Sequence, residues 1–186
     1  EGRMTVSRRR TLPGDLPRRE RIARMIRVDH AGEYGAKRIY EGQLAVLGRG
    51  PKGPVIEHMA EQEREHLDTF DRLVAERGVR PTLLHPLWHV GAFAMGAATA
   101  LLGDRAAMAC TVAVEEVIDD HYARQAEALG EEEPELKAVI ERFRGEEPEH
   151  RAIGLEHEAE QAPGYRLLSG AVKAATRTAI WLSERV

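Results

Sequence analysis

The chain has 186 residues, and its 27 Lys and Arg residues against 31 Asp and Glu residues give a formal net charge of −4 at pH 7. This length suits one globular domain that buries its own hydrophobic core, and a second domain is not expected. The acidic balance argues against binding to nucleic acid through a basic surface, and the single cysteine, Cys110, excludes an internal disulfide or a zinc site built from cysteine pairs.

Proline and glycine residues divide the chain into six predicted helices. Residues 1–16 are polar and arginine-rich, so we interpret them as a flexible leader or a remnant of expression. Pro86 is expected to interrupt the start of the third helix, and Asp104 to cap the fourth. The predicted helices, all within one domain at 17–186, span about 17–47, 54–77, 83–102, 104–129, 134–160 and 165–186. The sequence therefore predicts an all-α protein.

The predicted helix at about 83–102 contains no Asp, Glu, Lys or Arg. Its length approaches that of a membrane span, but a proline, two histidines and many alanines and glycines argue against spanning. We expect this helix to lie in a membrane interface or to pack against the core.

Residues 55–66 are repeated at 139–150. Val55, Ile56 and Glu57, followed by Glu63 and His66, align without a gap on Val139, Ile140 and Glu141, followed by Glu147 and His150. This match predicts two three-helix repeats, about 17–103 and about 104–186. The two repeats are expected to close into a ferritin-like four-helix bundle, with the third and sixth helices attached outside it.

Both copies contain Glu-x-x-His on an apolar stripe, where residues i and i+3 share one helix face. A dinuclear carboxylate site in a helix bundle takes this motif from two helices and one Glu from each of the other two. The apolar stripes of the first and fourth helices include Glu33 and Glu115, whereas Glu116 turns toward Asp120 and solvent. The predicted metal ligands are Glu33, Glu63, His66, Glu115, Glu147 and His150.

Four ionised carboxylates cannot be buried together without protons or cations to balance them. Two divalent ions would balance four glutamates, and oxygen and imidazole ligands with open positions suit iron or manganese. Activation of oxygen would select iron. Asp29, one helical turn before Glu33, is predicted as a hydrogen-bond acceptor beside the site.

Four segments closely resemble the demethoxyubiquinone hydroxylases: RVDHAGEYGA at 27–36, IYEGQ at 39–43, ACTVAVEE at 109–116 and WLSER at 181–185. The resemblance covers nearly everything after residue 16, and all six predicted ligands match the family's pattern. It implies a di-iron monooxygenase that hydroxylates the quinone ring of demethoxyubiquinone in ubiquinone biosynthesis, with O2 and electrons from NADH. It also implies a peripheral position on an inner membrane, at the mitochondrial matrix face or the cytoplasmic face of a bacterial membrane.

The resemblance assigns roles to six further residues. His121 and Tyr122 match positions near the substrate, with a satisfied polar pair at the edge of the core as the alternative. Arg24, Arg177, Trp181 and Arg185 match positions associated with NADH contact, although Trp181 replaces a more usual tyrosine. A membrane-surface face is the alternative for this group. The helix at about 83–102 would admit the isoprenoid tail from the lipid, with core packing as its alternative.

Three other functions were weighed against this one. A ferritin-like iron oxidase or storage protein shares the ligands but needs no lipid-facing helix. A di-iron hydroxylase acting on nucleic acid is disfavoured by the acidic balance, and a metal-free structural bundle by the cost of four buried glutamates. A lipid-binding partner protein is expected by analogy, and the sequence leaves a homo-oligomer open.

Overall fold

A computed structural model of the chain describes residues 16–186. This part of the chain contains six α-helices, one short 3₁₀ helix and no strand. The helices are α1 (Arg18–Leu47), α2 (Gly53–Arg77), α3 (His85–Leu101), α4 (Asp104–Leu129), α5 (Pro134–Glu156), η1 (Ala159–Gln161) and α6 (Tyr165–Ser183). The predicted all-α class is confirmed. The predicted leader lies outside the described residues except for Leu16.

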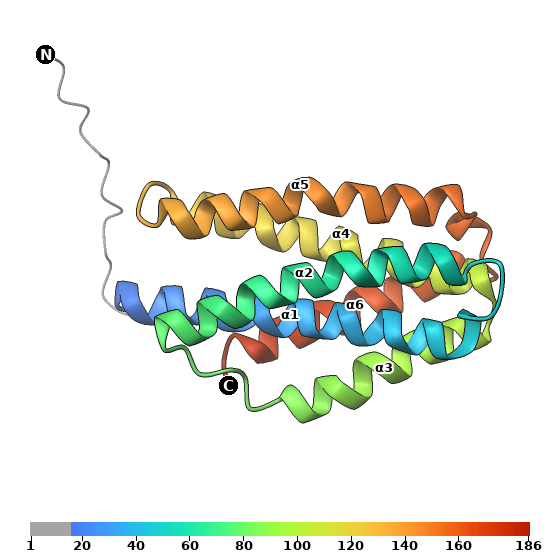
Figure 1. The fold of residues 1–186 in the computed structure, drawn as a ribbon, viewed down its shortest axis with the longest axis horizontal. Coiled ribbons are helices and arrows are strands. Elements are labelled where there is room, and N and C mark those ends of the chain that lie inside the picture. The colour runs from blue at the N-terminus through green and yellow to red at the C-terminus, as the bar shows by residue number, and fades with distance from the viewer. Residues whose placement is uncertain (1–15) are drawn as a thin grey trace, which may run out of the picture.

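Four long helices, α1, α2, α4 and α5, run lengthwise beside one another (Figure 1). α1 packs against α2 and α3, and α4 packs against α5 and α6. The bundle with two additional helices that the sequence predicted is therefore present. Its division into two repeats, about 17–103 and about 104–186, stays a prediction.

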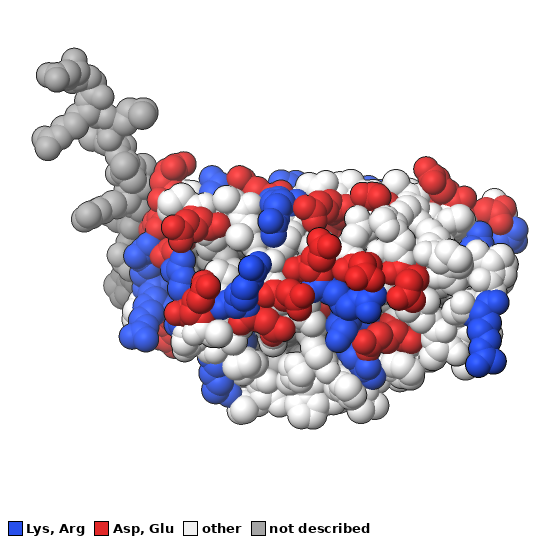
Figure 2. Space-filling view, viewed as in Figure 1, with Lys and Arg blue, Asp and Glu red and all other residues white. Residues whose placement is uncertain are grey.

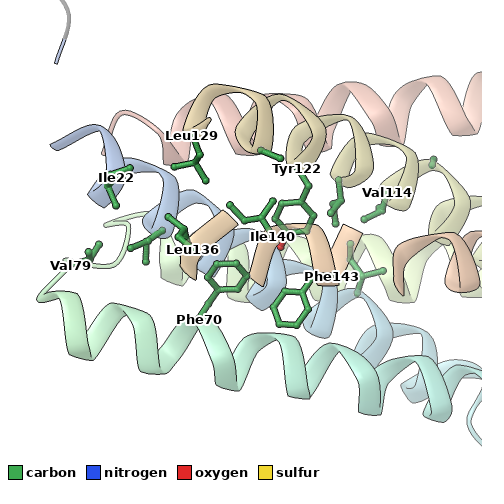
Figure 3. Packing of buried hydrophobic residues seen from close by; sticks show 14 of the residues in the cluster. Ile22, Phe70, Val79, Val114, Tyr122, Leu129, Leu136, Ile140 and Phe143 are labelled. Atoms are coloured by element: carbon green, nitrogen blue, oxygen red, sulfur yellow. The ribbon is translucent and has the colours of Figure 1, made fainter. Parts of the chain in front are cut away.

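Two apolar clusters fill the bundle at different levels along its length. One contains Ile26, Phe70, Ile118 and Phe143, and the other contains Tyr40, Met59 and Val112, with the partly buried Ile153 packed against it. Figure 3 shows Phe70, Tyr122 and Phe143 of the first cluster pointing into the same interior from three helices. On each long helix the predicted ligands lie between a residue of one cluster and a residue of the other, as Glu33 lies between Ile26 and Tyr40. The clusters therefore keep water away from the ligands on both sides.

The helix α3 crosses α1 at very short range because a glycine on each helix faces the backbone of the other helix. A Cβ atom added to Gly96 would lie 2.0 Å from the carbonyl oxygen of Ile39, and one added to Gly42 would lie 2.2 Å from that of Phe93. This contact attaches α3 to the bundle although much of its remaining surface is exposed. None of the helices in residues 16–186 is long and apolar enough to cross a membrane.

Two predictions at helix starts were wrong in detail. Pro86 lies in the first turn of α3 and does not interrupt the helix. A backbone N–H in the first turn has no partner within the helix, so proline, which lacks this N–H, costs no hydrogen bond there. At the start of α4 the cap position is Gly103, whose φ of 113° suits glycine, and Asp104 is already the first helical residue.

The fifth helix ends at Glu156, four residues before the predicted end at 160. Glu158 has a left-handed backbone conformation with φ 62°, which a right-handed helix cannot contain. Its carboxylate accepts a hydrogen bond from Arg105 at 2.8 Å, which holds the turn against α4. The short helix η1 follows this turn.

Replacing Gly96 by alanine is expected to lower the free energy of unfolding by about 1–3 kcal/mol, because the new methyl group would overlap the backbone of Ile39. Urea unfolding followed by circular dichroism measures the effect. The matched control is Gly91→Ala on the same helix, where an added Cβ meets nothing within 4 Å. That change should stabilise the protein by about 0.5–1 kcal/mol, since alanine favours a helix over glycine. Equal effects of both changes would contradict the close-crossing interpretation.

Candidate metal centre

The six predicted ligands converge inside the bundle from α1, α2, α4 and α5. Each has at most 2% of its surface exposed. They form two overlapping groups, Glu63 with Glu115, Glu147 and His150, and Glu33 with His66 and Glu147, in which the ligand atoms lie within 4.8 Å of one another. Glu147 belongs to both groups. The structure therefore brings all six residues to one buried place.

Two of the glutamates lie between the two histidines. Glu63 places Oε2 4.0 Å from Nδ1 of His66 and Oε1 3.1 Å from Nδ1 of His150. Glu147 places Oε1 3.8 Å from Nδ1 of His66 and Oε2 3.9 Å from Nδ1 of His150. Each carboxylate thus presents one oxygen to each half of the site, which is the arrangement of a bridging ligand.

The other two glutamates each face one histidine. Glu33 Oε2 lies 3.6 Å from Nδ1 of His66, and Glu115 Oε1 lies 3.5 Å from Nδ1 of His150. These two carboxylates are therefore placed as terminal ligands, one on each side. Each half of the site then has one imidazole nitrogen, one carboxylate of its own and a share in two others.

Every predicted ligand has a buried nitrogen or oxygen without a hydrogen-bond partner among the described residues. These atoms are Glu33 Oε2, Glu63 Oε1 and Oε2, His66 Nδ1, Glu115 Oε2, Glu147 Oε2 and His150 Nδ1. Buried polar atoms left without partners cost about 1–3 kcal/mol each, and more when they are charged. All are ligand atoms of types that suit iron. The residues present therefore fit a pair of metal ions.

Burial and mutual repulsion shift the pKa values of the ligand carboxylates when no metal balances them. Burial, with the charges of Glu33 and Glu115, raises the pKa of Glu63 to about 8. Burial and the charges of Glu115 and Glu63 raise the pKa of Glu147 well above its ordinary range. Without metal, these carboxylates take up protons near neutral pH.

The two histidines also favour the protonated form. Burial alone would lower the pKa of His66, but contacts with Glu33, Glu63 and Glu146 outweigh it and raise the pKa to about 9. Contacts with Glu115 and Glu63 likewise outweigh burial and raise the pKa of His150 to about 10. A metal ion must displace these protons, because only neutral imidazole coordinates.

Two tyrosines donate hydrogen bonds to the terminal carboxylates. The Tyr40 hydroxyl donates to Glu115 Oε1 at 2.8 Å, and the Tyr122 hydroxyl donates to Glu33 Oε1. Burial raises the pKa of both phenols well above the ordinary value, so they remain protonated donors. Each tyrosine lies seven residues after the ligand on its own helix and bonds to the ligand of the other helix.

The Nε2 atom of each predicted histidine ligand also has a partner on the other helix that carries a Glu-x-x-His motif. His66 Nε2 lies 2.7 Å from Glu146 Oε2, and His150 Nε2 lies 2.9 Å from Gln62 Oε1. Each partner directly precedes the glutamate of the opposite Glu-x-x-His motif. When Nε2 donates, Nδ1 is left free to face the ligand cluster.

Sequence reasoning did not assign roles to Gln62, Glu146 or the hydroxyl of Tyr40. The available signals were a polar residue before each motif glutamate and a tyrosine seven residues after each single glutamate. Both signals appear only when the two halves of the chain are compared position by position.

Asp29 and the predicted catalytic pair lie together at the edge of this network. His121 Nε2 lies 3.2 Å from Asp29 Oδ1 and 2.9 Å from Gln125 Nε2. Burial raises the pKa of Asp29, and the hydrogen bond and charge of His121 oppose the shift. Asp29 is thus the partner of His121 rather than of a ligand histidine, and Tyr122 touches the ligand Glu33 directly.

The residues expected to contact the nicotinamide nucleotide lie on α6 and α1. The guanidinium of Arg185 stacks over the Trp181 ring at 4.0 Å, and both side chains are exposed, as is Arg177. Arg24 is half-buried on α1, one turn before Val28, which lines the same cavity as Ser183 near the end of α6. Arg177 and Trp181 thus lie on the C-terminal part of α6 and Arg185 directly after it, whereas Arg24 lies on α1.

An apolar cavity of about 270 Å³ lies between α1, α3, α4 and α6. Its lining includes Gly32 and Val114, the sequence neighbours of the terminal ligands Glu33 and Glu115. Trp88 of α3 also lines it, and its indole N–H donates to Ser183 Oγ of α6 at 3.0 Å. The cavity thus borders the sequence neighbours of two predicted ligands, and the two additional helices form its outer side.

The metal-free chain is expected to have a lower free energy of unfolding at pH 8 than at pH 6. The folded pKa of His66, about 9, lies above its ordinary 6.5, and that of Glu63, about 8, lies above 4.5. Both groups therefore stabilise the metal-free fold at low pH, and this stabilisation is lost as pH approaches the folded values.

Because Co(II) displaces the same protons, the rise in Tm that it causes should be larger at the higher pH. Each displaced proton changes the binding free energy by about 1.4 kcal/mol per pH unit. The measurement is the Tm of the protein with chelator and with Co(II), each at pH 6 and at pH 8. An equal rise in Tm at both would contradict proton displacement.

The family of ubiquinone biosynthesis protein COQ7 matches residues 20–183 of the chain. A 3-demethoxyubiquinol 3-hydroxylase of Rhodospirillum rubrum is 59% identical over 186 residues, which cover 100% of this chain and 87% of the relative. The mitochondrial NADPH-dependent 3-demethoxyubiquinone 3-hydroxylase of Bos taurus is 57% identical over 172 residues, which cover 90% of this chain and 79% of the relative. The mitochondrial 5-demethoxyubiquinone hydroxylase of Saccharomyces cerevisiae is 44% identical over 182 residues, 89% of this chain and 78% of the relative. The chain therefore belongs to the COQ7 family of ubiquinone biosynthesis proteins.

Proposed function

We propose that this chain is a di-iron monooxygenase that adds a hydroxyl group to the quinone ring of demethoxyubiquinone in ubiquinone biosynthesis. O2 and electrons from a reduced nicotinamide nucleotide would be its co-substrates. The observation that carries the proposal is a buried cluster of six metal-ligand side chains directly beside an apolar cavity. Relatives are named as hydroxylases of demethoxyubiquinone or demethoxyubiquinol.

The six ligands would hold two iron ions, with Glu63 and Glu147 shared between them. When bound, the iron pair supplies the activation of O2 that no amino-acid side chain can perform. Tyr40 and Tyr122 orient the terminal carboxylates by hydrogen bonds from their hydroxyls. The apolar clusters at either side exclude water, which protects a reactive site from side reactions.

The apolar cavity would hold the substrate with its ring toward the ligand cluster. Its walls are almost wholly aliphatic and include the glycines Gly32, Gly35 and Gly91, which leave room for a flat ring or an isoprenoid chain. A storage protein for hydrated iron has no use for such a cavity. This feature favours the hydroxylase over the ferritin-like iron oxidase or storage protein.

The third helix would place the mouth of this cavity at a membrane surface. Leu83, Leu87 and Val90 expose 65%, 54% and 65% of their surfaces, and α3 has no charged residue. Figure 2 shows the edge formed by α3 as mostly uncharged, in contrast to the densely charged face of α2 and α5. We propose peripheral attachment there, to an inner membrane of a mitochondrion or a bacterium.

His121 and Asp29 would hold a proton near the substrate ring. They are paired at 3.2 Å, and their neighbours Ile118 and Val28 line the cavity. We propose that this pair takes up the proton released when the ring carbon is hydroxylated, with Asp29 orienting the imidazole.

The exposed face of Arg177, Trp181 and Arg185 would bind the reduced nicotinamide nucleotide. Guanidinium groups bind phosphates, and the Trp181 ring offers a surface for stacking. The resemblance predicts NADH, whereas several relatives are named as NADPH-dependent. Parallel assays with both nucleotides distinguish them. A lipid-binding partner and a homo-oligomer stay predictions.

Replacing Glu147 by alanine is expected to lower ring hydroxylation by about 100-fold or more, because both metal positions lose a shared ligand. The assay combines purified protein, iron, reduced nucleotide and a demethoxyquinone under labelled O2, and mass spectrometry detects one labelled hydroxyl oxygen. The matched control is Glu149→Ala on the exposed face of the same helix, which should keep its activity. Equal loss in both variants, or iron oxidation without labelled quinone in the native chain, would contradict the proposed function.

Filling the cavity with Gly35→Leu is expected to lower kcat/KM for a long-tailed quinone by about tenfold without changing the iron content. An added Cβ at Gly35 meets nothing within 4 Å, so the larger side chain enters the cavity rather than the bundle core. Gly145→Leu on α5, where the space is also open, is the control for helix propensity. Unchanged kcat/KM in the Gly35 variant would remove the cavity from the substrate path.

A further inference from the structure

Two polar cavities approach the ligand cluster from the charged side of the bundle. One, of about 660 Å³, lies between α2 and α5, and the other, of about 320 Å³, lies between α4 and α5. The second is lined by Glu115, Glu116, Asp119, Asp120, Glu147, Pro148 and Arg151. Two of these residues are metal ligands, so this cavity reaches the site itself.

The buried end of the α4–α5 cavity carries unpartnered ligand atoms. Glu115 and Glu147 expose 1% and 2% of their surfaces, and Oε2 of each has no hydrogen-bond partner among the described residues. A cation that leaves this cavity and loses its water would therefore find two unpartnered carboxylate oxygens directly behind its inner wall.

The α2–α5 cavity ends differently. It reaches His66 and Phe143, and no ligand carboxylate lines it. The Phe143 ring stacks on the His66 ring at 4.0 Å, and His66 Nε2 is already bound to Glu146 at 2.7 Å. A cation there meets the back of His66, because Nδ1 faces the ligand cluster on the other side of the ring.

The outer part of the α4–α5 cavity consists of three acidic side chains on one face of α4. Glu116 and Asp120 are four residues apart, and Asp119 lies between them at i+3 from Glu116. Arg151 Nε lies 3.3 Å from Glu116 Oε1, and Lys173 Nζ pairs with Glu116 Oε2. Arg144 Nε lies 2.9 Å from Asp119 Oδ1. These ion pairs are partly exposed and therefore weak, so a divalent cation can replace the arginines.

Pro148 removes one backbone hydrogen bond from the helix that forms a wall of the cavity. A proline inside a helix has no N–H to donate to the carbonyl four residues earlier, which here is Arg144. Pro148 lies directly after the predicted ligand Glu147 and lines the cavity. The helix α5 thus has one backbone hydrogen bond fewer at the place where an ion would pass.

We propose that the α4–α5 cavity is the route by which divalent metal ions reach the centre, with Glu116, Asp119 and Asp120 holding the hydrated ion before Glu115 and Glu147 bind it. The inference rests on the proposed di-metal site. Five carboxylates against one guanidinium line this route, and a cavity lined by one sign of charge concentrates counter-ions and raises their association rate.

The test is the rate at which the metal-free chain binds Co(II), measured by stopped-flow absorbance, together with the number of ions bound at the end. The double variant Asp119→Asn with Asp120→Asn should slow association about tenfold, with the final two ions per chain unchanged. Arg151→Gln should act in the opposite direction, because it removes the one positive charge among the described residues that line the cavity, although Glu116 keeps its ion pair with Lys173.

The matched control is the double variant Glu65→Gln with Asp68→Asn, which removes two charges from the α2–α5 cavity. It should leave the rate within about twofold of the native chain. Equal slowing by both double variants, or slowing by the control alone, would overturn the route. Failure of the native chain to bind two ions at all would instead overturn the di-metal site, so the two failures are distinguishable.

Discussion

The burial of four carboxylates and two imidazoles in one place is the constraint on which this structure depends. Such a cluster repels itself and loses hydration, so it persists only with protons or cations between its members. The two apolar clusters on either side fix the ligand helices in place and exclude water. The same exclusion strengthens the binding of cations, because attraction between charges is greater in a low-dielectric interior.

The contacts around the ligands cross between the two halves of the chain. Tyr40 of the first half bonds to Glu115 of the second, and Gln62 bonds to His150. The reciprocal contacts run from Tyr122 to Glu33 and from Glu146 to His66. This reciprocity supports the proposed duplication, since each half completes the other's site. It is broken at one point, where Glu146 and Gln62 differ in charge, so the two halves of the ligand cluster have unequal surroundings.

The helices, and the convergence of the six predicted ligand side chains on one buried place, could be predicted from the sequence because both depend on local spacing. Glu-x-x-His on an apolar stripe must face inward, and two matched copies specify how the helices pair. The end of α5 could not be predicted, because the left-handed turn at Glu158 depends on Arg105 of another helix. The partner of Asp29 was missed for the same reason, since His121 reaches it only after α1 and α4 have packed.

Under the proposed function, the site would accept two kinds of molecule that need opposite surroundings. An isoprenoid quinone gains free energy by leaving water, whereas a divalent ion keeps its water until carboxylates replace it. One opening cannot serve both, because charges that attract the ion would lose their hydration against the quinone. The bundle provides aliphatic walls between α1, α3, α4 and α6 and acidic walls between α4 and α5. Residues of α4, the helix of Glu115, line both cavities, so this one helix would separate the proposed path of the apolar substrate from the proposed path of the ion.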